Sequence, residues 1–105
     1  MIEEVLVKIF GKSTHVQVIL LFYSNRKYLT NITGLAKRLG KSHVPVRKAV
    51  SDLIEAGILS EMTIGKSRMI KLNENSPYTK ALLNFINTID ELDSSQPYKV
   101  KIPAR

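Results

Sequence analysis

The hydrophobic pattern of this sequence changes period at Gly57, and this change constrains the fold more than any other feature. Before it, Val46, Val50, Leu53 and Gly57 are spaced by four, three and four positions. This spacing predicts one face of a helix that ends at the glycine. After it, residues 58–72 carry β-branched residues around a glycine-containing link, which favours a β-hairpin. The chain therefore has to accommodate a helix that runs directly into a hairpin.

Helical spacing and capping residues predict further helices on both sides of this unit. Before it, we expect a helix over 2–10 ended by Gly11, a helix from the capping pair Thr14 and Gln17 to Asn25, and a short helix capped by Thr33 and ended by Gly40. The hairpin has the link Gly65-Lys66-Ser67. After it, we expect a helix from Ser76 and Pro77 to about Leu92. The order predicts an α+β fold that is mainly α. We expect a domain over 1–75, a dimerisation helix over 76–92 and a loose tail over 93–105.

The segment KSHVPVRKAV, residues 41–50, places a proline at the start of a predicted helix. With Ser42 as N-cap, Pro45 is the third helical residue, where the missing N–H costs little because first-turn N–H groups have no partner in the helix. Proline also disfavours helical angles at Val44, which allows a helix start nearer Pro45. The helix is expected to survive in either case.

The same segment has an unfavourable charge distribution for an isolated helix. Arg47 and Lys48 lie near the N-terminus, where each base costs ~0.3–1 kcal/mol against the helix dipole. A Lys48–Asp52 pair would recover only ~0.2–0.5 kcal/mol. A bound phosphate explains the arrangement better, since cations and helix N–H groups would converge on one anion.

The charge of the whole chain points the same way. The net charge is +7, and residues 1–72 hold 12 basic and 5 acidic residues, whereas the remainder holds four of each. Such an asymmetric basic surface attracts polyanions, although a solvated surface is the simpler interpretation of any charge run taken alone.

Several classes of protein are disfavoured. The chain has no cysteine, and His15 and His43 lack the spacing of a metal motif, so we expect no metal and no cofactor. No nucleophile–base set, carboxylate pair or phosphate-cradling loop is found, which argues against an enzyme. The longest apolar run, residues 18–23, is too short to span a bilayer. No signal peptide is recognisable. We therefore expect a soluble, cytoplasmic, nucleoid-associated protein with no membrane partner.

Residues 9–72 resemble the winged helix-turn-helix family of archaeal and bacterial transcription regulators. FGKSTHVQVILLFYSN is similar to the entry helix of that family, and NITGLAKRLGKSHVPVRKAVSDLIEAGIL to its helix-turn-helix core. The matching residues are Leu35-Ala36, Ser42, Val46, Lys48, Leu53 and Glu55-Ala56-Gly57. The resemblance implies a two-stranded wing and an extra C-terminal helix. That helix is similar to those of the MarR-, PadR- and Sso-type dimers.

This resemblance implies that a recognition helix over about 42–56 enters the DNA major groove and that the wing, 64–68, contacts the flanking minor groove or backbone. Arg47 is the candidate for bidentate contact with guanine and Lys48 for phosphate. Pro45 departs from the family, in which this place usually holds a serine or threonine that touches DNA. The candidate DNA-contact residues are Lys37, Arg38, Lys41, Ser42, His43, Pro45, Arg47, Lys48, Ser51, Lys66, Ser67 and Arg68.

The C-terminal helix carries apolar residues at steps of four, three, four and three, the spacing of a heptad seam. The candidate interface residues are Tyr78, Leu82, Phe85, Ile89 and Leu92. The seam either packs on its own domain or pairs with a second copy of the chain, and the stripe in residues 2–10 could join such an interface. Dimerisation is the favoured interpretation, because the seam follows a domain that is already complete.

Three functions fit these features. The first is a homodimeric, sequence-specific regulator of transcription that binds double-stranded DNA. The second is a sequence-tolerant architectural or chromatin protein, which the loss of a hydroxyl at Pro45 favours. The third is a winged helix used for protein interaction, which would bind DNA weakly or not at all. A small-molecule effector stays open.

Overall fold

The computed structural model describes residues 2–95, so most of the predicted tail, residues 96–105, lies outside the described part. The elements in chain order are α1 Ile2–Phe10, α2 Thr14–Ser24, β1 Leu29–Thr30, α3 Ile32–Leu39, α4 His43–Glu55, β2 Leu59–Ile64, β3 Ser67–Leu72 and α5 Pro77–Ser95. The mainly helical α+β architecture predicted from the sequence is confirmed.

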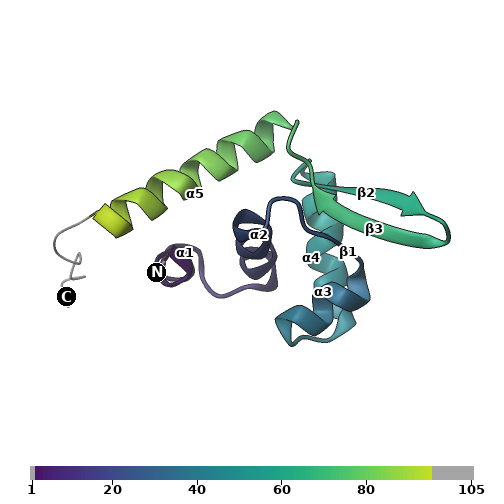
Figure 1. Ribbon diagram of the computed structural model, residues 1–105. Helices are drawn as coiled ribbons and strands as arrows, with labels where there is room; N and C mark the ends of the chain where they lie inside the picture. The colour runs from purple at the N-terminus through teal and green to yellow at the C-terminus, as the bar shows by residue number, and fades with distance from the viewer. Residues whose placement is uncertain (1, 96–105) are drawn as a thin grey trace.

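The two ends of the molecule are formed by different secondary-structure elements (Figure 1). The β2–β3 hairpin, which we call the wing, projects at one end, beside α3 and α4. At the other end, α5 runs away from the base of the wing and passes over α1, while α2 lies between α1 and α4. The C-terminal helix thus starts beside the end of α4 and the base of the wing, and its far end lies over α1.

The main core lies where α2, α3 and α4 meet the sheet. Its fully buried side chains include Phe22, Leu35, Val46 and Ile70, one from each of these elements. A second, smaller cluster joins α1, α2 and α5. Its buried members are Ile2, Leu6, Leu20 and Ile86. Helix α1 contributes only to the second cluster, whereas α5 contributes to both, through Leu83 in the main core and Ile86 in the second.

The sheet has three strands rather than the two of the predicted hairpin. The strand order is β1-β3-β2, with both pairs antiparallel. Strand β1 pairs Leu29 with Lys71 and Thr30 with Ile70, and it was not predicted because two residues are too few to display a period. The wing turn contains Gly65 and Lys66 only, since Ser67 is already paired with Ile64 in the ladder.

Glycines end two of the helices, as predicted. Gly40 has φ +67° at the C-cap of α3, and Gly57 has φ +83° between α4 and β2. A Cβ added at Gly57 would also lie 3.3 Å from the Ser76 hydroxyl oxygen, so this position is restricted by both backbone conformation and space.

The predicted N-caps of two helices were wrong by one and two residues. Helix α2 is capped by Ser13, whose hydroxyl accepts a hydrogen bond from the Val16 amide at 3.1 Å, so Thr14 is the first helical residue. Helix α3 is capped by Asn31, whose side-chain oxygen accepts from the Gly34 amide at 2.8 Å. Because the side-chain oxygen of Asn31 already caps the first turn, the helix begins at Ile32 and Thr33 lies inside it.

Helix α4 begins at His43, with Ser42 at the N-cap, which is the earlier of the two starts that the sequence allowed. Pro45 is therefore the third helical residue, and the helix continues through it to Glu55. The proline lies in the first turn, where its missing N–H removes no intrahelical bond.

Helix α5 extends to Ser95, three residues beyond the predicted end. Its first turn is fixed by Thr79, a fully buried residue whose hydroxyl donates to the carbonyls of Gly57 at 3.0 Å and Ile58 at 3.3 Å. Further along, the Tyr23 hydroxyl of α2 donates to the Asp90 carboxylate at 3.1 Å. Burial and this bond raise the pKa of Tyr23 above its ordinary value. These contacts attach α5 to its own domain at two places.

Candidate nucleic-acid interface

The two faces of α4 differ completely in chemistry. Val46, Ala49, Val50 and Leu53 are buried in the main core. The opposite face is exposed, and its members, spaced by three, one and three positions, are Val44, Arg47, Lys48 and Ser51. Because residues three and four apart are neighbours on a helix, these four form one continuous stripe. The predicted outward orientation of Arg47, Lys48 and Ser51 is thus confirmed.

Lys48 lies in a small network that reaches back to α2. Its ammonium group is 3.1 Å from one carboxylate oxygen of Asp52, which confirms the predicted pair at positions i and i+4. The other oxygen of Asp52 is 2.7 Å from Nε2 of His15. His15 therefore has a defined partner on α4, a contact that no local pattern could reveal across 37 positions of chain.

The hydrogen bonds from His15 and from Lys48 lower the pKa of the Asp52 carboxyl below its ordinary value of 3.8. Asp52 is therefore ionised at neutral pH and can hold Lys48. Arg47 differs from its neighbour: within residues 2–95 it forms no ion pair, and its guanidinium group is exposed. The two adjacent bases of α4 thus present one free and one restrained positive charge.

The N-terminus of α4 is exposed and only partly satisfied. Ser42 occupies the N-cap position, but its side chain makes no capping hydrogen bond. The first-turn amides of α4 are therefore available to an external acceptor. His43 is tied to α3, since its Nε2 lies 3.2 Å from the hydroxyl of Thr33. Lys41 and Pro45 beside them are half-buried.

Helix α3 contributes basic residues at its C-terminal turn. Lys37 and Arg38 are both exposed there. The Arg38 guanidinium lies over the Tyr28 ring, 5.1 Å from its centroid, which orients this side chain by a cation–π contact. Both residues precede the turn into α4, so they flank the start of the predicted recognition helix.

The predicted wing residues lie at the tip of the hairpin, where all three are exposed. Lys66 is in the turn, and Ser67 and Arg68 begin β3. Arg68 is 3.2 Å from the Glu61 carboxylate across the hairpin, so its guanidinium is restrained. Lys66, in contrast, makes no ion pair within the described residues. The tip and the α4 stripe belong to separate projections of the domain (Figure 1).

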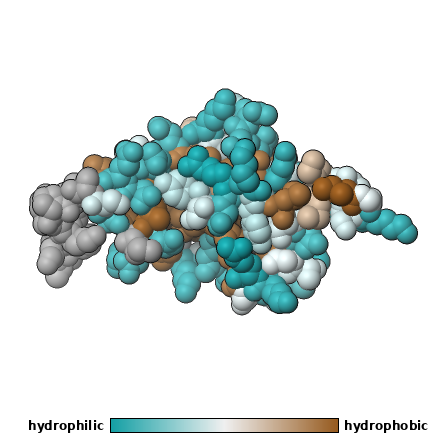
Figure 2. All heavy atoms as spheres, in the orientation of Figure 1, coloured by the Kyte–Doolittle hydropathy of each residue, from teal (hydrophilic) through white to brown (hydrophobic). Residues whose placement is uncertain are grey.

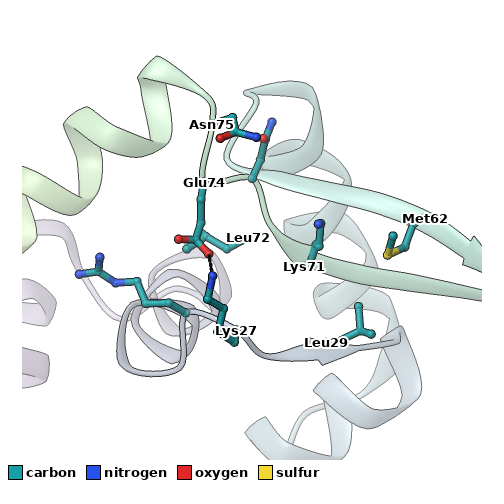
Figure 3. A pocket seen from close by; sticks show the side chains of 9 residues that line it. Lys27, Leu29, Met62, Lys71, Leu72, Glu74 and Asn75 are labelled. Carbon is teal, nitrogen blue, oxygen red and sulfur yellow. Dashed lines mark ion pairs between the residues drawn. The ribbon is translucent and has the colours of Figure 1, made fainter.

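An open groove of about 500 Å³ lies at the base of the wing (Figure 3). Lys27, which lies just before β1, and Glu74, which lies in the segment before α5, form an ion pair in this groove, with a nitrogen–oxygen distance of 3.3 Å. Leu29, Met62 and Leu72 supply its apolar part. None of the predicted DNA-contact residues lines this groove, so it is distinct from the α4 stripe.

The predicted seam of α5 divides into two sets. Leu82 and Ile89 are half-buried and pack on the clusters of their own domain. Tyr78, Phe85 and Leu92 are exposed. Hydrophobic surface is visible both at the α1–α5 end and over the wing (Figure 2).

Helix α1 extends this apolar surface. Ile9 and Phe10 are exposed at its C-terminal end, and Phe10 packs edge-on against Phe85 with ring centroids 6.1 Å apart. We call the set of exposed residues on α1 and α5 the terminal-helix face. Its members are Ile9, Phe10, Tyr78, Phe85 and Leu92.

No family model matches this sequence, and no curated protein matches it. Among solved structures, the chain is similar to the adhesin competence repressor AdcR of Streptococcus pyogenes, with 20% identity, a TM-score of 0.54 and coverage of 88% of this chain and 74% of that one. It is also similar to the transcriptional regulator BldR from Sulfolobus solfataricus, with 15% identity, a TM-score of 0.55 and coverage of 91% and 71%.

This chain has a winged helix-turn-helix fold. The helix-turn-helix is formed by α3 and α4, and the wing by β2 and β3. The resemblance recognised from residues 9–72 is thereby confirmed for the fold. In this winged helix, no group of three or more potential metal ligands occurs within residues 2–95, and no helix of that part is long and apolar enough to cross a membrane.

Proposed function

We propose that this winged helix is a homodimeric transcription regulator that binds double-stranded DNA sequence-specifically, with α4 in the major groove. The observation that carries the proposal is the exposed stripe of α4, in which Arg47 and Lys48 occupy the side opposite the core. A helix of this kind fits a groove ~12 Å wide. The names of the two similar structures, a repressor and a transcriptional regulator, agree with this function.

The two basic residues of the α4 stripe have different proposed roles, because within residues 2–95 Lys48 is paired with Asp52 and Arg47 is not. Arg47 is free within the described chain, and its fork of donors matches the O6 and N7 acceptors of guanine. Lys48 serves a phosphate, which would replace or share its contact with Asp52. Ser42 and the first-turn amides of α4 supply donors for a second phosphate, because no side-chain cap occupies them. The remaining α4 contacts of the proposal are His43, Pro45 and Ser51.

The flanking contacts come from α3 and the wing. Lys37, Arg38 and Lys41 would fix the phosphate backbone beside α4, since such contacts position a protein on DNA without reading its sequence. Lys66, Ser67 and Arg68 would reach the adjacent minor groove or its backbone. The pairing of Arg68 with Glu61 makes Lys66 the stronger cation of the tip.

Homodimerisation is supported by the terminal-helix face. Its apolar side chains run along α5 from Tyr78, near the base of the wing, through Phe85 to Leu92, and continue onto Ile9 and Phe10 of α1. A pair of domains joined there would present two copies of α4 to successive major grooves ~34 Å apart on a pseudo-palindromic site. A nucleoid location follows from this function. Leu82 and Ile89 would support the interface from beneath.

Selection of bound duplexes from a random pool, followed by anisotropy titrations at several salt concentrations, tests this function. Wild type is expected to enrich a pseudo-palindrome and to lose affinity steeply with salt. Arg47→Ala should cost about ten-fold to one-hundred-fold at one guanine and relax the preference there. Lys80→Ala on α5 removes the same charge and is the matched control. If Arg47→Ala and Lys48→Ala both bind as wild type does, α4 is not the recognition helix.

A second candidate function is a sequence-tolerant architectural DNA-binding protein. Pro45 favours it, because the place held by a serine or threonine in the resembling family has no hydroxyl in this chain. Genome-wide footprinting separates the two functions. Discrete palindromic sites support a regulator, whereas even coverage supports the architectural role.

A further inference from the structure

Val44 is the most exposed large hydrophobic residue in residues 2–95, with 72% of its surface accessible. It is the second residue of α4, so it lies in the turn that a recognition helix inserts first. The stripe that it shares with Arg47, Lys48 and Ser51 is otherwise polar. Single exposed apolar residues are common on protein surfaces, but this one lies on the proposed reading face, one turn before Arg47.

Local energetics do not favour a valine at this position. Valine is β-branched and is a weaker helix former than most residues, and the residue before a proline is disfavoured in a helix. Val44 meets both conditions and makes no contribution to either hydrophobic cluster. Its methyl groups are therefore available to an external apolar group.

The major groove offers one apolar group on its base edges, the C5-methyl of thymine. The other groups exposed there are hydrogen-bond donors and acceptors, for which a valine side chain has no use. A β-branched side chain in a helix is held in one strongly preferred rotamer, so Val44 presents its methyl groups with little rotamer freedom left to lose.

We propose that Val44 reads the methyl group of a thymine next to the base contacted by Arg47. This proposal rests on the proposed function and adds a specific base to it. Arg47 is three positions further along α4, hence directly adjacent on the stripe. The half-buried Pro45 ring lies beside Val44 and has no hydrogen-bond donor, so the start of α4 forms an apolar step. The residue that departs from the resembling family then belongs to an apolar reading surface.

The test uses the duplex selected by wild type. Each thymine of one half-site is replaced in turn by uracil, which removes only the C5-methyl and keeps every hydrogen bond of the base pair. Affinity is measured by fluorescence anisotropy at one salt concentration for wild type, Val44→Ala and the isosteric Val44→Thr. Leu29→Ala is the control, because it truncates another exposed apolar side chain that is not among the proposed DNA contacts. Circular dichroism checks the folding of the variants.

At one thymine of the half-site, the uracil exchange is expected to weaken wild-type binding about four-fold, the effect of one buried methyl group. Val44→Ala should bind the unmodified duplex about as weakly and show no further loss with uracil. Val44→Thr, which keeps one methyl, should fall between the two. Leu29→Ala should keep the uracil effect.

Three outcomes would overturn the inference in distinguishable ways. A uracil effect that is absent at every position, or that is equal in wild type and Val44→Ala, removes Val44 as a methyl reader and leaves specific DNA binding intact. A pool without any enriched sequence removes base reading by Val44 and favours the architectural function. An absence of DNA binding overturns the proposed function itself and the inference with it, and makes Val44 a contact for a protein partner.

Discussion

Asp52 connects a residue of α2 to a residue of the proposed DNA-contact surface on α4. One carboxylate oxygen is held by His15 of α2 and the other holds Lys48. A carboxylate beside the proposed DNA-contact stripe repels phosphate, and the contacts of Asp52 with Lys48 and His15 reduce this repulsion. Binding by two donors lowers the pKa of Asp52 and keeps its charge in place, which makes the orientation of Lys48 a property of α2 as well as of α4.

Asp52→Asn is expected to raise the affinity for DNA several-fold at low salt. It removes a repulsive charge and releases Lys48, so the slope of log affinity against log salt should steepen by about one phosphate contact, or roughly 0.9. Anisotropy titrations between low and physiological salt measure both quantities.

Glu55→Gln is the matched control, because it makes the same charge change one turn further along α4. It should raise affinity less and leave the slope unchanged. Equal effects from the two variants would mean that Asp52 acts through its charge alone and exerts no particular control over Lys48.

At the scale of elements, the joint between α4, β2 and α5 organises the domain. Gly57 turns the chain from the helix into the wing with a positive φ, and Thr79 of α5 bonds to the carbonyls of Gly57 and Ile58. Ser76 supports the same place, since its hydroxyl accepts a hydrogen bond from the Tyr78 amide at 3.2 Å. Helix α4, the wing and α5 therefore share one point of attachment.

Thr79→Val should lower the free energy of unfolding by about 1–3 kcal/mol, because it keeps the shape of a buried side chain but removes the donor to two carbonyls. Urea denaturation measures the change. Thr88→Val is the control: the Thr88 hydroxyl bonds to the Asn84 carbonyl on the exposed side of α5, and its loss should cost less than about 0.5 kcal/mol. Equal losses from both variants would show that the joint is not special.

The elements differ in how far the sequence could predict them. Helix α4, the wing and the helix ends at Gly40 and Gly57 follow from local sequence signals, namely a hydrophobic period and a glycine after the last helical residue. Both glycines have a positive φ in the structure. Strand β1 has no such signal, because two residues carry no period and pairing with β3 alone makes them a strand. The cap of α3 was misplaced because Asn31 and Thr33 are both good cap residues and only geometry selects between them.

The outward residues of α4 and the Lys48–Asp52 pair were predicted from the sequence, but the contact of Asp52 with His15 was not. The outward stripe of α4 follows from helical geometry once the core face is known. The contact between His15 and Asp52 depends on how α2 packs on α4, which neither segment encodes by itself. Exposure of Val44 was equally within reach of the helical period, since it lies four positions before Lys48, but an apolar residue on a polar face attracts no attention until its accessibility is known.

At the scale of the whole molecule, the terminal-helix face and the α4 stripe belong to different helices, and α5 runs away from the joint that it shares with α4. The proposed function thus assigns association and DNA recognition to separate helices, so we expect that each can be changed by its own substitutions. Part of the predicted seam packs on its own domain through Leu82 and Ile89, which fixes the direction of α5 before any partner binds. A dimer interface on Phe85 and Leu92 would therefore be preorganised.

Phe85→Glu and Leu92→Glu are each expected to convert a dimer to a monomer, because a charge replaces an exposed apolar side chain at the proposed interface. Light scattering coupled to size-exclusion chromatography measures the mass. Met62→Glu is the control, since Met62 is 39% exposed on the wing and Phe85 is 41% exposed on α5. Dimeric mass in both α5 variants would remove the terminal-helix face as the interface.

The bonds of Thr79 have a mechanical consequence. Helix α5 has 19 residues, so it is a rigid lever about 28 Å long whose pivot lies at the joint of α4 and the wing. A rotation of about 5° at this pivot displaces the far end of the lever by about 2.4 Å. Packing of Ile86 and the Tyr23–Asp90 hydrogen bond resist such a rotation together with Thr79, so in a dimer joined through α5 these contacts would limit how much variation in half-site spacing the protein tolerates on DNA.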